Sequence, residues 1–139
     1  MKTAHHKRRL VTVLCADVQG FSRLMGTDEE GTVDQLKACR ELVDDLAQKR
    51  DGRMFGVAGD SIMIEFASPV EATRCAREIQ QHLENSNAGL PTDRQMKLRI
   101  GIHIGDVVVE DGLLYGDDVN IAARLQAAAP SGGDRKSVV

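Results

Sequence analysis

The chain has 139 residues, the size of one domain, and it is long enough to bury a hydrophobic core. Hydrophobic residues make up 42% and charged residues 28%, and the net charge of −3 gives no general attraction to nucleic acids. No apolar run reaches the roughly 18 residues of a membrane span, and the basic N-terminus lacks the apolar stretch of a signal peptide. We therefore expect a soluble, cytoplasmic domain that has no membrane segment and no nucleic-acid partner.

The first predicted element is a buried strand from about Arg9 to Asp17, preceded by a basic tail at residues 1–8. We interpret the tail as solvated and disordered rather than as a binding arm. The strand is a continuous apolar run that ends on Asp17. A carboxylate at the end of a buried strand costs free energy unless a cation or a hydrogen-bond donor compensates it.

The rest of the chain is expected to form alternating helices and strands, with apolar residues at helical spacing in the helices and strict alternation in the long strand. The predicted order begins with a loop at 18–22, a helix starting near 27–30 and ending before Asp51, and hairpin strands at 53–57 and 62–66. A helix opening at Ser68-Pro69 and a loop at 85–93 follow. The order ends with a strand at 96–104 that has one buried face, a short strand at 106–110, a turn at 111–112 and a helix at 117–128. This order predicts an α+β fold of the ferredoxin-like kind, in which helices cover one face of an antiparallel sheet.

The last six residues, 134–139, match one translated frame of a common sequencing adapter. We expect a non-native tail after a domain at 9–133 whose last strands are missing. An ordinary frayed tail is the alternative. The three cysteines, Cys15, Cys39 and Cys75, lie among apolar neighbours and are expected to be small buried side chains in a reducing compartment.

Asp17 and Asp60 are the leading candidates for chemistry, because the first ends a buried strand and the second sits in the turn of the hairpin. Two carboxylates brought together would repel each other unless a divalent metal lay between them. The segment Gly20-Phe21-Ser22 follows the first strand and offers backbone amides near a helix start, which is a suitable environment for phosphate oxygens.

Asn120 and Arg124 form a second candidate constellation. Residues four apart share one face of a helix, so the arginine fork would reach a phosphate while the asparagine orients a sugar or a leaving oxygen. An exposed polar helix face is the alternative interpretation.

Four stretches together resemble the catalytic domain of class III nucleotidyl cyclases of the bacterial adenylate cyclase type. They are ADVQGFS at 16–22, GDS at 59–61, LRIGI at 98–102 and YGDDVNIAAR at 115–124. The resemblance runs from about Arg9 to Gly133, and it implies an enzyme that converts ATP to 3′,5′-cyclic AMP and pyrophosphate in signal transduction.

The resemblance also implies roles for the candidate residues at the interface of a head-to-tail homodimer. Asp17 and Asp60, with the backbone carbonyl of Val18, would hold two Mg²⁺ or Mn²⁺ ions. The amides of Gly20, Phe21 and Ser22 would bind the phosphates. Asn120 and Arg124 would come from the other subunit to orient the ribose and stabilise the transition state.

Two positions depart from the family pattern. In adenylate-cyclising members a lysine and an aspartate or threonine recognise the base, and here Gly56 and Leu113 stand in their places. The base preference is therefore open, and a cyclase-like module that dimerises or senses nucleotide without turnover is the alternative function. Guanylate cyclisation ranks lower, since the glutamate and cysteine that usually read guanine are also absent from these positions.

Overall fold

The computed structural model describes residues 7–110, 113–116 and 134–137. Its elements in chain order are β1 (Lys7–Val18), α1 (Phe21–Thr27), α2 (Glu29–Gln48), β2 (Arg53–Ala58), β3 (Ser61–Phe66), α3 (Pro69–Asn87), the 3-10 turn η1 (Thr92–Arg94), β4 (Leu98–Glu110), β5 (Leu113–Tyr115) and β6 (Asp134–Ser137).

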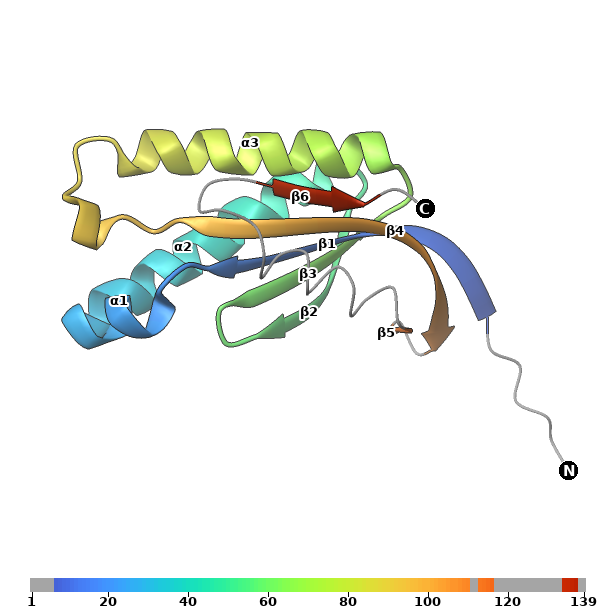
Figure 1. The fold of residues 1–139 in the computed structure, drawn as a ribbon, viewed down its shortest axis with the longest axis horizontal. Coiled ribbons are helices and arrows are strands. Elements are labelled where there is room, and N and C mark those ends of the chain that lie inside the picture. The colour runs from blue at the N-terminus through green and yellow to red at the C-terminus, as the bar shows by residue number, and fades with distance from the viewer. Residues whose placement is uncertain (1–6, 111–112, 117–133, 138–139) are drawn as a thin grey trace, which may run out of the picture.

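The sheet has the strand order β2-β3-β1-β4-β5, with β1 at its centre between the antiparallel neighbours β3 and β4. This order confirms the predicted ferredoxin-like α+β fold, and α2 and α3 lie on one face of the sheet (Figure 1). β6 pairs in parallel with Ile100–His103 of β4, so the described sheet is mixed rather than purely antiparallel.

The main core lies between the sheet and the helices, and it is mostly aliphatic, with Phe66, 1% exposed, as the one aromatic residue among its described buried members. Alternate residues of β1 supply its sheet side, namely Leu14, Ala16 and Val18. The helices contribute residues at three- and four-residue spacing, as Leu36, Cys39, Val43, Leu46 and Ala47 do in α2.

A second, smaller core lies on the other face of the sheet, and the burial of Gly101 and His103 on that face corrects the prediction that the strand at 96–104 has only one buried face. It contains Val11, Val13, Cys15, Val107 and Leu114. The sheet curls so that its outer strands β2 and β5 contact each other, which buries the centre of this face. His103 of β4, which pairs with Val13, is only 2% exposed for the same reason.

Several predicted boundaries also change. The strands expected at 96–104 and 106–110 form one strand, β4, because β1 pairs with it without interruption from Lys7 to Val18. The first strand begins at Lys7, inside the segment predicted as a tail. The predicted loop at 18–22 is shorter than expected, since α1 begins at Phe21.

At the C-terminal end, β5 is a strand that the sequence did not indicate, and residues 134–137 of the predicted tail form β6. The predicted helix at 117–128 lies outside the described residues.

The three cysteines are buried and free, as predicted. Burial raises the pKa of each thiol to about 11, so the thiols stay protonated and unreactive near neutral pH. For Cys75 the neighbouring Glu78 adds to this effect of burial on the pKa.

None of the described helices is long and apolar enough to cross a membrane.

Asp28 separates α1 from α2, whose start near 27–30 agrees with the prediction. Its extended backbone (φ −155°) ends α1, and its Oδ1 accepts the Gly31 amide at 3.1 Å as the N-cap of α2. Arg94 of η1 donates to Oδ2 of the same carboxylate at 2.7 Å. The bond from Gly31, and then the contact with Arg94, hold the pKa of Asp28 below its ordinary value of 3.8.

We expect this carboxylate to make folding stability depend on pH in the acid range. Because its folded-state pKa is lowered, its contribution is present above pH 3.8 and is lost as the pH falls through the folded-state pKa. Asp28→Asn keeps a good N-cap but cannot titrate. The difference in urea midpoint between wild type and Asp28→Asn should therefore shrink from pH 6 to pH 3, whereas Asp93→Asn serves as an exposed control. An unchanged difference would contradict this role.

Candidate functional site

Asp17 is the last residue but one of β1, and it lies opposite Arg99 of β4 in the strand register. The guanidinium binds the carboxylate through two hydrogen bonds, with Nε–Oδ1 and Nη2–Oδ2 distances of 3.1 Å each. The side chains of Asp17 and Arg99 are 18% and 29% exposed. Such a bidentate ion pair fixes the position of the carboxylate and compensates the free-energy cost of burying its charge.

Asp60 lies in the turn between β2 and β3, directly after Gly59, whose φ of +58° is the left-handed conformation that glycine adopts easily. Its Oδ2 accepts a hydrogen bond from the backbone N–H of Val18 at 3.1 Å. The hydrogen bond joins residues that are 42 apart in the sequence. It places Asp60 next to the end of β1, where Asp17 also lies. Figure 1 shows the hairpin turn and the end of β1 at the same end of the sheet.

The segment after β1 turns sharply into α1. Gly20 has a φ of +64° and occupies the N-cap position of α1, with no hydrogen bond from a capping side chain. The amide of Gln19 donates to the carbonyl of Lys97 at 2.9 Å, which ties this turn to the chain entering β4. Ser22 is exposed, while Phe21 packs against the main core. The first amides of a helix have no partner within it, so they are available to an acceptor.

The residues present suit a hard divalent cation. Carboxylate and carbonyl oxygens are the ligands that Mg²⁺ and Mn²⁺ prefer. Each carboxylate oxygen has two lone pairs, so the bonds from Arg99 to Asp17 and from Val18 to Asp60 leave acceptor capacity for a metal. No group of three or more histidine, cysteine, aspartate or glutamate side chains converges within the described part of the chain. A metal here would therefore rely on the two aspartates and on backbone, water or substrate oxygens.

The two positions predicted to face the base lie on β2 and β5, the strands that meet where the sheet curls. Gly56 belongs to β2, next to a register shift between Met54 and Gly56, and Leu113 begins β5 opposite Glu110. A Cβ added at Gly56 would lie 3.7 Å from the nearest atoms of Met63, an ordinary van der Waals distance. The backbone at this position therefore accepts a larger side chain. Asn120 and Arg124 lie outside the described residues.

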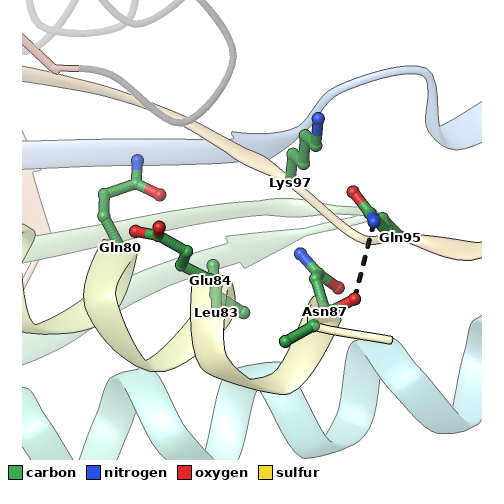
Figure 2. Close-up of a pocket in the computed structure, with 7 residues that line it drawn as sticks. Gln80, Leu83, Glu84, Asn87, Gln95 and Lys97 are labelled. Carbon is green, nitrogen blue, oxygen red and sulfur yellow. Dashed lines mark hydrogen bonds between the residues drawn. The ribbon is translucent and has the colours of Figure 1, made fainter. Parts of the chain in front are cut away.

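A pocket of about 410 Å³ lies elsewhere, between α3 and the chain entering β4 (Figure 2). It is lined by Gln80, Leu83, Glu84, Asn87, Ala88, Gln95 and Lys97. These side chains largely serve the fold, since the amide of Gln80 donates to the carbonyl of Leu98 at 3.1 Å and that of Asn87 to the carbonyl of Met96 at 2.9 Å. None of them is a predicted site residue, and we place the candidate site at the carboxylates.

Sequence reasoning missed Arg99, which contacts Asp17 directly. It belongs to the alternating strand predicted at 96–104 and to the motif LRIGI, but the sequence assigns it neither a partner nor a role. Its role depends on the register between β1 and β4, which pairs residues 82 apart. An arginine between the apolar residues Leu98 and Ile100 of a buried strand is the signal that could have drawn attention to it.

Comparisons with known proteins agree with the motifs. The family described as the adenylate and guanylate cyclase catalytic domain matches residues 3–133. A Rhizobium meliloti protein named "Putative adenylate cyclase 3" is 44% identical over 91% of this chain and 22% of its own length. A Streptomyces coelicolor adenylate cyclase is 34% identical over 88% of this chain and 31% of its own length.

Among solved structures, the adenylate/guanylate cyclase/hydrolase from Silicibacter pomeroyi is 40% identical and superposes with a TM-score of 0.83, covering 92% of this chain and 75% of that one. The chain thus spans less than a third of the two curated relatives described above.

Proposed function

Because the chain belongs to the adenylate and guanylate cyclase catalytic domain family, we propose that it catalyses the cyclisation of ATP to 3′,5′-cyclic AMP and pyrophosphate. In this reaction the ribose 3′-oxygen bonds to the α-phosphorus, the bond from that phosphorus to the pyrophosphate oxygen breaks, and the 3′-hydroxyl proton passes to solvent. The observation that carries the proposal is the bond from Val18 to Asp60, which brings the second carboxylate to the end of the strand that bears the first.

The proposed metal ligands are Asp17, Asp60 and the backbone carbonyl of Val18. When bound, two Mg²⁺ or Mn²⁺ ions would supply charge to the triphosphate and acidify the 3′-hydroxyl. Arg99 keeps the carboxylate of Asp17 in one orientation through its two hydrogen bonds. Because arginine is always charged, it also adds a fixed positive charge beside the expected position of the phosphates.

The phosphates themselves would be bound by the turn at Gly20, Phe21 and Ser22. The positive φ of Gly20 turns the chain directly from β1 into α1, so free first-turn amides follow closely after Asp17. The packing of Phe21 against the core anchors this turn, which limits its movement when an anion binds.

We propose that the working form is a homodimer. Asn120 and Arg124 of the partner subunit would complete each site, orienting the ribose and stabilising negative charge at the α-phosphate. An arrangement in which each subunit supplies part of a site would combine the carboxylates and amides of one subunit with the Asn120 and Arg124 that the sequence motif at 115–124 provides in the other. The mass of the protein in solution, with and without nucleotide, tests this assembly.

The chemistry is tested by incubating the protein with Mn²⁺ and either ATP or GTP and measuring cyclic nucleotide and pyrophosphate. We expect cyclic AMP and pyrophosphate in equal amounts from ATP. Absence of both cyclic nucleotides would overturn the enzymatic proposal. It would favour the non-catalytic alternative, a dimerising or nucleotide-sensing module, which the atypical residues Gly56 and Leu113 support. A dominant cyclic GMP product would favour guanylate cyclisation instead.

Gly56→Lys tests the base-recognition position. The space beside Met63 accepts the first atoms of the side chain, so the variant should fold normally. A lysine there would donate a hydrogen bond to adenine, and we expect the ratio of kcat/KM for ATP to that for GTP to rise by about tenfold or more. Gly56→Met is the matched control, because it adds comparable bulk without a donor. An equal ratio in both variants would contradict the assignment of this position to the base.

A further inference from the structure

Arg40 of α2 reaches from the helical layer to the turn that carries Asp60. Its Nη2 donates a hydrogen bond to the backbone carbonyl of Gly59, 19 residues further along the chain. Its Nε is buried and has no hydrogen-bond partner among the described residues. A buried donor without a partner costs free energy, so this conformation of Arg40 needs a compensating contact. The hydrogen bond to the Gly59 carbonyl supplies it.

The carbonyl that Arg40 binds belongs to the peptide linking Gly59 to Asp60. A peptide unit is planar, so fixing its carbonyl also fixes the direction in which the chain enters Asp60. On the other side of the same residue, the carboxylate accepts the amide of Val18 at 3.1 Å. Asp60 is thus held at its backbone by a helix and at its side chain by the end of β1.

The turn itself has little other support. It is a two-residue connection between Ala58 and Ser61, which are paired in the hairpin register. Gly59 is exposed, and a Cβ built on it would have no atom within 4 Å. A glycine at the tip of a hairpin leaves the backbone many conformations, so a contact from outside the hairpin is what restricts them.

We propose that Arg40 is a positioning residue that holds the Gly59-Asp60 turn so that the Asp60 carboxylate stays against Val18 and beside Asp17. Its proposed importance for metal binding rests on the proposed function, whereas its effect on the Asp60–Val18 contact does not. Arginine suits this role because its guanidinium combines a long reach with several donors in a rigid plane.

The first test is hydrogen exchange at the Val18 amide, which reports the contact directly and requires no activity. Arg40→Met keeps most of the length and apolar stem but removes all donors. We expect Val18 exchange to accelerate by about tenfold in this variant through local opening, while the Thr12 amide in the middle of β1 keeps its wild-type rate. Asp60→Asn calibrates the response of Val18, and Arg74→Met, a change in an exposed arginine of α3, is the matched control.

The second test is the Mn²⁺ concentration that gives half-maximal activity. A displaced Asp60 should raise it by about tenfold in Arg40→Met, and Arg74→Met should leave it unchanged. Arg40→Lys keeps the charge and one flexible donor, so smaller changes in the same direction are expected. This variant also decides the question if Arg40→Met does not fold.

Unchanged Val18 exchange in the Arg40 variants would overturn the positioning role, even if the wild type is an active cyclase. Accelerated exchange in these variants, together with a wild type that forms no cyclic nucleotide, would support the positioning role while the proposed function fails. The two failures are therefore distinguishable.

Discussion

Asp17→Asn is expected to lower cyclic nucleotide formation by at least about 100-fold, because the loss of a direct metal ligand should cost no less than the loss of its outer partners. The asparagine has nearly the same shape and still offers one oxygen to Arg99, so the strand pairing between β1 and β4 should persist. Activity is measured as cyclic AMP formed from ATP at saturating Mn²⁺, and folding is checked by the urea midpoint.

Asp106→Asn is the matched control for this change. Like Asp17, Asp106 forms an ion pair between β1 and β4, but with the two strands exchanged: Asp106 lies on β4, and Nη1 of Arg8 on β1 lies 3.3 Å from its Oδ2. This pair is well exposed, with side-chain exposures of 66% for Arg8 and 55% for Asp106, and such pairs contribute little. Asp106→Asn should therefore retain wild-type activity. Activity surviving in Asp17→Asn would remove the metal-ligand assignment from Asp17.

The candidate carboxylates could be located from the sequence because each stands at a position where a charged side chain is unexpected or exposed to a ligand by the local pattern. Asp17 ends a continuous apolar run, and Asp60 follows a glycine between two short strands. The fold class could be predicted as well, since the succession of one strand, helix, hairpin, helix and strand leaves few ways to pack a sheet under its helices.

Arg99 and Arg40 could not be assigned in this way, because their roles depend on contacts between distant elements. Arg99 meets Asp17 through the register of β1 against β4, and Arg40 meets Gly59 through the seating of α2 beside the hairpin. The second core was missed for a similar reason. Whether the far face of a sheet is buried depends on its curl, and local alternation does not encode that curl.

Phe66→Ala is expected to lower the free energy of unfolding by about 3–5 kcal/mol. Phe66 is 1% exposed and lies in the main core at the end of β3, where it supports the strand that leads back from the Asp60 turn. Removing the ring leaves a cavity that the surrounding elements fill only in part. Urea unfolding followed by circular dichroism measures the loss, and Phe66→Leu gives a milder version if the alanine variant does not fold. A loss below about 1 kcal/mol would contradict a packed core at this position.

The Phe66 ring explains why residue 52 is a glycine, and Gly52 provides a second test of the same packing. A Cβ built on Gly52 would lie 2.5 Å from Cε1 and 2.8 Å from Cζ of Phe66, too close for both atoms to stay in place. Gly52→Ala should therefore cost about 1–3 kcal/mol in the wild type, whereas Gly56→Ala, with its nearest contact at 3.7 Å, should be nearly neutral.

In the Phe66→Ala background the ring is gone, so adding the methyl at residue 52 should cost less and fill part of the cavity. The double-mutant cycle should then give a coupling of about 1 kcal/mol or more, because the two side chains compete for one space. Additive effects would show that the strain at Gly52 comes from the Ala47 carbonyl, 3.0 Å from the added Cβ, and not from the ring.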